Sequence, residues 1–191
     1  MGFRISWLAA QGLSKSQLLA HFGLVDTLVA DAANEAPFSA AELPSGWTLL
    51  WSNDPAFATI ARCTRLSRLA PVLSCWVNET AMFSSANYFE GGVYRWFAGH
   101  ALDQGADHLV HEGDMPPQFD GIRARLTASQ AEYGERQPPV DFLFDIPVEL
   151  AQSICGFRHD EYHESMHGFT EAVPAPEKPK GLLGRLFGGG R

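Results

Sequence analysis

Residues 71–111 have the sequence PVLSCWVNETAMFSSANYFEGGVYRWFAGHALDQGADHLVH. Side chains alternate in character along residues 73–78 and 93–98, with the period of two that is typical of a β-strand. Polar or glycine-containing breaks follow at residues 78–79, 91–92 and 103–105, and such residues favour turns. These breaks connect the strands by only a few residues, and the crossover that parallel pairing needs is much longer. The segment therefore predicts an antiparallel meander of short strands.

The flanking sequence predicts further strands and helices around this meander. Residues 3–8 alternate in the manner of a strand, and Ser14 with Gln17 forms a capping box that starts a helix at Lys15. The order of elements along the chain predicts an α+β fold, with a mainly antiparallel sheet and helices packed on one face. The other predicted elements are strands at 46–52 and 140–144, a loop at 26–45, and helices that begin near Pro55, Phe119 and Val148.

Length and composition predict one globular domain with a tail. The chain has 191 residues, of which 46% are hydrophobic, and this is enough for a single α+β domain at residues 1–171. Residues 172–191 are rich in proline and glycine and carry four basic residues and one acidic residue. Such a composition supplies no core, so we predict a disordered tail. Its segment GLLGRLF, residues 181–187, is a candidate docking peptide for a partner or a membrane surface.

The charge balance bears on the class of partner. The chain carries 14 basic and 22 acidic residues, for a formal net charge of −8. Removing the +3 of the tail leaves −11 on residues 1–171. A surface of this sign repels phosphate backbones and anionic membranes. We therefore expect no nucleic-acid partner, and a basic protein fits best.

Cysteine content and hydropathy predict a cytoplasmic protein. The three cysteines, Cys63, Cys75 and Cys155, are too scattered for a disulfide framework and fit a reducing compartment. The first residues contain only a brief apolar run, too short for the core of a signal peptide. No stretch approaches the roughly 20 apolar residues of a spanning helix. We expect a chain without a transmembrane segment.

Three segments resemble a group of uncharacterised bacterial proteins with similar opening and closing stretches. They are GFRISWLAAQG at residues 2–12, VDFLFDIPVELA at 140–151 and GFRHDE at 156–161. These segments correspond to a predicted first strand and a predicted last strand-helix pair, so they are structural in character. No activity is attached to the group. The resemblance implies a bacterial cytosolic protein and transfers no catalytic residue.

One short motif points to metal chemistry. His163, Glu164 and His167 spell H-E-x-x-H, which on a helix places two zinc ligands and a general base on one turn. His159 would lie one turn earlier on the same face. The segment is polar all round and Gly168 follows it, whereas a catalytic zinc helix belongs to a packed core. We therefore favour a solvated, silent segment over adventitious metal binding, and both over a hydrolytic zinc site.

Other polar groups have weaker claims. The charged cluster at residues 158–161 suits the edge of a pocket, but we favour an ion pair of Arg158 with a nearby carboxylate beside an exposed His159. His111 lies close in sequence to two carboxylates, a pattern that is common at strand edges without function. Cys75 with a histidine would make a nucleophile and base, yet its apolar strand favours a structural thiol. The chain contains no nucleophile-elbow or phosphate-loop motif.

The aromatic side chains of the meander support a first functional hypothesis. Most of them must belong to the core, but alternation along the strands lets a minority emerge on an uncovered face, where Tyr and Trp suit protein binding. Our first hypothesis is a non-enzymatic acidic interaction or immunity-type protein that receives a basic partner. The alternative is a zinc-dependent hydrolase with Glu164 as base and His159, His163 and His167 as ligands. The aromatic residues are Trp76, Phe83, Tyr88, Phe89, Tyr94, Trp96 and Phe97.

Overall fold

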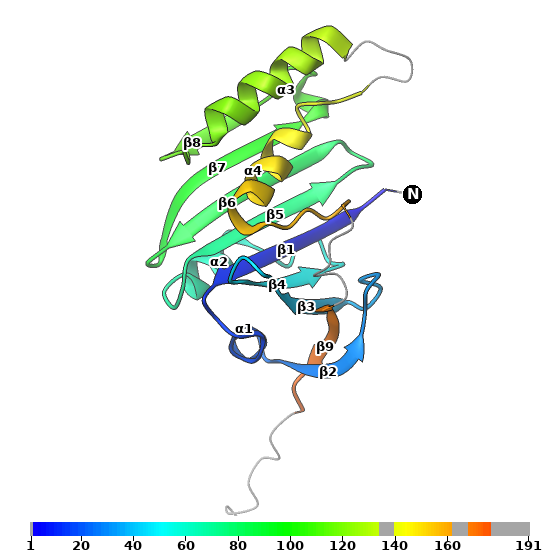
Figure 1. Cartoon of the computed structure of the whole chain (residues 1–191), viewed down its shortest axis with the longest axis vertical. Helices are drawn as coiled ribbons and strands as arrows, with labels where there is room; N and C mark the ends of the chain where they lie inside the picture. Colours follow the sequence, from blue (N-terminus) through cyan, green and yellow to red (C-terminus); the bar gives the residue numbers. More distant parts are fainter. Residues whose placement is uncertain (1, 134–139, 162–167, 177–191) are drawn as a thin grey trace, which may run out of the picture.

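The computed structural model describes residues 2–133, 140–161 and 168–176. These residues form one nine-stranded sheet in the order β2-β9-β3-β4-β1-β5-β6-β7-β8, in which every pair of neighbours is antiparallel (Figure 1). The strands are β1 (Arg4–Gln11), β2 (Leu24–Ala30), β3 (Phe38–Glu42), β4 (Trp47–Ser52), β5 (Val72–Asn78), β6 (Phe83–Glu90), β7 (Val93–Ala101), β8 (Val110–Gly113) and β9 (Thr170–Pro174). The helices are α1 (Lys15–His21), α2 (Ile60–Leu66), α3 (Phe119–Tyr133) and α4 (Asp145–Cys155).

The predicted α+β class and the antiparallel sheet are confirmed, but the helices cover both faces rather than one. Figure 1 shows α3 and α4 in front of the sheet and α2 behind it. The central strands are buried on both sides. Alternate side chains along each of them therefore enter two different cores, rather than one core and the solvent. In β1, Trp7 faces the α3/α4 core, while Leu8 faces the α1/α2 core. A single sheet of this width therefore carries two hydrophobic layers.

Local sequence signals set several boundaries as predicted. The meander of residues 71–111 forms β5 to β8 through consecutive antiparallel pairs. The alternation predicted for residues 93–98 is wrong at its start, because the register of β7 with β6 shifts and places Tyr94 and Trp96 on opposite faces. Helix α1 begins at Lys15, and the Ser14 and Gln17 side chains complete the capping box. Helix α4 ends at Cys155 and is capped by Gly156, which takes the left-handed conformation with φ 79°, as expected of a glycine cap.

Three expectations about single elements are wrong. Residues 26–45, predicted as a loop, contribute most of β2 and all of β3, because their backbone groups pair with β4 and β9. Residues 140–144, predicted as a strand, form the turn before α4, where Oδ1 of Asp141 accepts a hydrogen bond from the Phe144 amide. Helix α2 begins at Ile60 behind a Thr59 cap, later than the predicted start at Pro55.

The sheet extends beyond the predicted end of the domain. Strand β9 comprises Thr170–Pro174 and lies between β2 and β3. Ala172 is buried in the α1/α2 core. The predicted boundary at residue 172 is therefore too early, and the part of the predicted tail from residue 177 lies outside the described residues.

Candidate functional site

His159 is the one member of the zinc hypothesis that lies in the described residues. Its side chain is fully shielded from solvent, with Nε2 3.4 Å from Oε1 of Glu79 and an edge contact to the Phe3 ring. Burial outweighs the neighbouring carboxylates and lowers the pKa of His159, so the imidazole is neutral at pH 7. The other three members, His163, Glu164 and His167, lie outside the described residues.

Within the described ranges, no group of three or more His, Cys, Asp or Glu side chains is placed to hold a metal ion. His159 belongs to the packing between the start of β1 and the β5–β6 turn. Its Nδ1 atom is buried and has no hydrogen-bond partner among the residues that the structure describes. Oδ1 of Asp160 lies 3.8 Å from this atom, which is too far for a hydrogen bond.

The charged cluster after α4 is an ion-pair network. Arg158 reaches back to Asp145 at the start of α4, with 2.6 Å between Nη2 and Oδ1, and its Nε lies 2.6 Å from Oδ1 of Asp160. The Arg158 side chain is mostly buried. The predicted ion pair is confirmed, and the expected exposure of His159 is wrong because the Phe3 ring covers it.

His100 and Asp141 form a second buried pair. Nε2 of His100 lies 2.9 Å from Oδ2 of Asp141, and Nδ1 lies 2.6 Å from the carbonyl oxygen of His108. Carbonyl and carboxylate oxygens only accept hydrogen bonds, so this arrangement favours the imidazolium. Burial alone would lower the pKa of His100, but the hydrogen bonds to Asp141 and to the His108 carbonyl raise it. Because neither nitrogen is left to accept a proton, this pair joins β7 to the turn before α4 and is unsuited to general base catalysis.

The histidine at β8 does not meet the adjacent carboxylate. His111 and Glu112 alternate across β8, opposite Ala98 and Phe97 of β7. The His111 ring contacts Phe119 of α3 at 4.8 Å between centroids, whereas Glu112 lies on the other face of the sheet. The suggested grouping of His111 with two carboxylates is therefore not formed.

All three cysteines are free and buried. Burial raises the pKa of Cys63 and of Cys155 to about 12. Burial also raises the pKa of Cys75. These groups remain thiols at pH 7 and are poor nucleophiles, so the structural interpretation of Cys75 holds.

An open groove lies on the α1/α2 face of the sheet, over β5 to β8. Its volume is about 810 Å³, and a wall at residues 55–61 is formed by the segment that leads into α2. Ser6 of β1 anchors this wall, because its hydroxyl donates to the Asp54 carbonyl and accepts from the Ala58 amide. We call this feature the aromatic groove. Its strand-borne side chains include Trp76, Phe83, Asn87, Tyr94, Phe97 and Glu112.

The register of the strands explains why aromatic rings gather in the groove. Trp76 contacts Phe83 at 4.3 Å between ring centroids. The Phe97 ring lies over Gly99, where a Cβ atom would come within 2.4 Å of it. The hydroxyl of Tyr94 donates to Oδ1 of Asn87 at 2.8 Å. The rings are thus held by neighbours on the sheet and form a pre-organised surface.

The predicted emergence of a minority of aromatic residues is confirmed. Trp76 is 40% exposed and Tyr94 is 37% exposed, whereas Phe89 and Trp96 are buried. Helices α1 and α2 cover β1 and its neighbours on this face and leave much of β5 to β8 open. Exposed rings of this kind are typical of sites for protein contact.

The margin of the groove carries the carboxylate of Glu112 and the guanidinium of Arg4. Burial and the nearby Glu112 carboxylate raise the pKa of Tyr94 to about 12. Residues 101–114, which run from the end of β7 through β8, contain no lysine or arginine. Their acidic members are all exposed. These are Asp103, Asp107, Glu112 and Asp114.

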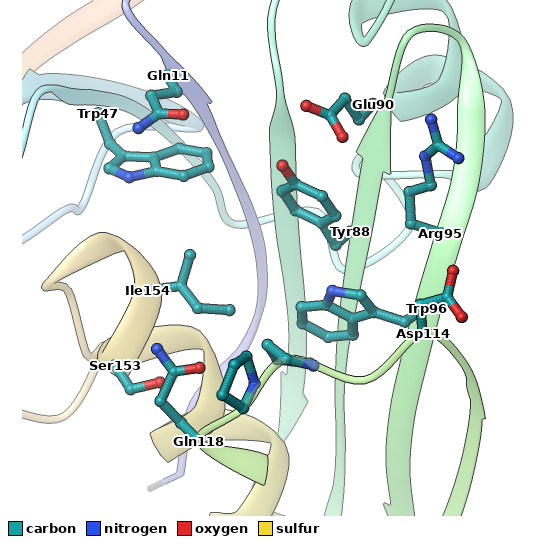
Figure 2. Close-up of a pocket in the computed structure, with 12 residues that line it drawn as sticks. Gln11, Trp47, Tyr88, Glu90, Arg95, Trp96, Asp114, Gln118, Ser153 and Ile154 are labelled. Atoms are coloured by element: carbon teal, nitrogen blue, oxygen red, sulfur yellow. The ribbon is translucent and has the colours of Figure 1, made fainter.

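A second cavity, of about 720 Å³, lies on the opposite face between the sheet and the end of α4. Figure 2 shows Trp47 on one side of the open space and Tyr88 with Trp96 on the other, while Ile154 of α4 lies along a third side. We call this feature the aromatic cavity. Its polar and charged lining residues are Gln11, Glu90, Arg95, Asp114, Gln118 and Ser153.

Sequence reasoning missed the aromatic cavity. Trp47 begins β4 and pairs with Gln11 at the end of β1, while Tyr88 pairs with Trp96 across β6 and β7. These segments are distant in sequence, and only the strand order brings their ends together. The aromatic groove, by contrast, lies mainly on consecutive strands, where alternation is itself a signal.

Comparisons with protein-family models, with curated proteins and with solved structures found no match. Among the described helices, none is both long and apolar enough to cross a membrane.

Proposed function

We propose that the protein is a non-enzymatic acidic interaction protein, of the binding or immunity type, that receives a basic partner on the aromatic groove. The observation that carries this proposal is the exposure of Trp76 and Tyr94 on a part of the sheet that α1 and α2 leave open. Trp and Tyr are enriched among residues that dominate the energy of protein interfaces. Three cysteines without a disulfide bond fit the reducing environment of the cytoplasm, where we place the protein.

Charge favours a partner segment that contains lysine or arginine beside apolar residues. Glu112 lies at the groove next to Tyr94, where Arg4 is the one cationic residue among the described residues of the lining. Asp103 and Asp107 are exposed between β7 and β8. A cationic side chain at Glu112 would also approach the face of the Tyr94 ring, where cation–π attraction is available. Opposite charge at an interface accelerates encounter and sets the orientation of the partner.

The proposal is tested by selecting random displayed peptides on the immobilised full-length protein. We expect the enriched peptides to carry net positive charge together with aromatic or aliphatic residues. Resynthesised peptides should bind Trp76→Ala at least about tenfold more weakly than the parent protein, because an interface Trp commonly contributes more than 1 kcal/mol. Binding should also weaken with rising salt.

Matched variants separate the groove from the general surface. Leu28→Ala removes an apolar side chain that is 80% exposed on the distant strand β2, and Glu35→Gln removes an exposed carboxylate outside the groove. Both should leave affinity unchanged, whereas Glu112→Gln should reduce it. Enrichment of neutral or acidic peptides, or equal binding to the folded Trp76→Ala variant, would refute the proposal.

A further inference from the structure

The aromatic cavity on the α4 face has walls suited to a cation. Trp47 and Trp96 are almost completely buried and line the cavity, and Tyr88 lies 5.8 Å from Trp96 in a stacked arrangement. The rings come from β4, β6 and β7, so the sheet holds them in fixed positions. The negative face of an aromatic ring attracts a positive charge placed within about 6 Å.

Three further groups give the cavity negative potential. Glu90 and Asp114 place carboxylates at the mouth, and Figure 2 shows both on the side of Tyr88 and Trp96. The last turn of α4 contributes Ser153 and Ile154 to the lining. The end of an α-helix carries a partial negative charge from its carbonyl groups. One opposing charge, the exposed guanidinium of Arg95, also lines the cavity.

The Tyr88 hydroxyl is suited to this environment as a neutral group. Burial, assisted by the Glu90 carboxylate, raises the pKa of Tyr88. The ring therefore remains protonated at pH 7, and its phenol oxygen carries no formal charge. The negative charges that face a ligand are thus those of Glu90 and Asp114.

We propose that the aromatic cavity binds a small organic cation with an alkylated ammonium group, held by the rings of Trp47, Tyr88 and Trp96 and by the carboxylates of Glu90 and Asp114. Alkyl groups on the nitrogen contact the rings, while the positive charge is balanced by the carboxylates and the end of α4. The volume of about 720 Å³ lies in the range of small-molecule sites. This site lies on the opposite face from the aromatic groove and is independent of the partner proposed there.

The test compares choline with 3,3-dimethylbutan-1-ol, a neutral molecule of the same shape, by calorimetric titration of the full-length protein. We expect choline to bind saturably and the neutral molecule to bind at least about tenfold more weakly, because only the charge differs. Equal binding of the two, or no saturable binding of choline, would overturn the proposal.

Variants that remove a charge at the mouth of the cavity should change the affinity for a cation in opposite directions. Glu90→Gln should weaken choline binding by about threefold and Arg95→Gln should strengthen it by a similar factor, since both residues are exposed and partly screened. Tyr88→Leu should weaken binding about tenfold. Glu112→Gln and Trp76→Ala alter the groove on the other face and should leave choline binding unchanged. Weaker binding of choline to Arg95→Gln would contradict the proposed attraction of the cavity for a positive charge.

Discussion

Replacing Asp141 by asparagine should destabilise the protein in a way that depends on pH. In the native state Oδ2 of Asp141 accepts from Nε2 of His100 at 2.9 Å, and the His100 side chain is fully buried. Burial alone would lower the pKa of His100, but the hydrogen bonds to Asp141 and to the His108 carbonyl outweigh it, and the pKa is raised above 6.5. Asp141→Asn keeps the shape of the side chain and removes the charge that stabilises the imidazolium.

The expected magnitude follows from the burial of the pair. Removing one partner of a buried ion pair costs about 3–5 kcal/mol, and because Asp141 retains 11% exposure we expect the lower end, about 3 kcal/mol at pH 6. A raised histidine pKa gives a contribution that is complete below the unfolded value and is lost as pH rises through the folded value. The cost of Asp141→Asn should therefore be smaller at pH 9, by about 1 kcal/mol.

Urea unfolding of the parent and variant, followed by tryptophan fluorescence at both pH values, measures this difference. Comparing the two proteins at each pH cancels groups such as His159, whose lowered pKa acts with the opposite sign below pH 6.5. Glu149→Gln is the matched control: it removes a carboxylate from a largely exposed pair with Arg125, at a cost of about 0–1 kcal/mol at either pH. A cost of Asp141→Asn that is the same at both pH values would refute an imidazolium at His100.

Further predictions concern the backbone, the thiols and the core. Gly113→Ala should destabilise the protein by more than about 2 kcal/mol in urea unfolding, because its φ is 84° and a Cβ would lie 2.0 Å from the Arg95 carbonyl, whereas Gly121→Ala within α3 should stabilise it by about 0.5–1 kcal/mol; the same sign for both would be inconsistent with these backbone conformations. A thiol reagent should modify none of the three buried cysteines in native protein and all three after unfolding, and rapid labelling of native protein would disprove their burial. Leu50→Ala, at a fully buried position of the central strand β4, should cost about 3 kcal/mol in the same unfolding assay, and a cost as small as that of Leu28→Ala would contradict the two-layered core.

Local signals allowed several elements to be predicted from the sequence. The capping box of Ser14 and Gln17 lies within four residues, so the start of α1 can be read from the local sequence. The alternation in residues 71–111 likewise depends only on neighbouring residues and predicts the meander. The aromatic groove follows only in part from the same pattern: Trp76 emerges where alternation places it, whereas Tyr94 reaches the same face because the pairing of β6 with β7 shifts register between Tyr88 and Phe89.

The remaining features depend on partners that are distant in sequence. The alanine-rich strand β3 has low intrinsic strand preference, but Ala40 and Ala41 are buried where β3 pairs with β4 and β9. The apolar residues 140–144 resemble a strand, yet Leu143 and Phe144 fill the core beneath α4. The charges and rings of the aromatic cavity meet only through the strand order, so no local pattern identified it.

The central claim is that the aromatic groove is the binding face, and the five tryptophans provide a direct measurement. Their indole N–H resonances report on separate places: Trp76 lies in the groove, Trp47 and Trp96 line the aromatic cavity, and Trp7 and Trp51 are buried in the core. When a selected basic peptide is titrated into ¹⁵N-labelled protein, we predict that the Trp76 resonance shifts progressively while the Trp47 and Trp96 resonances stay in place. A bound peptide that moves the cavity resonances and leaves Trp76 unchanged would contradict the account.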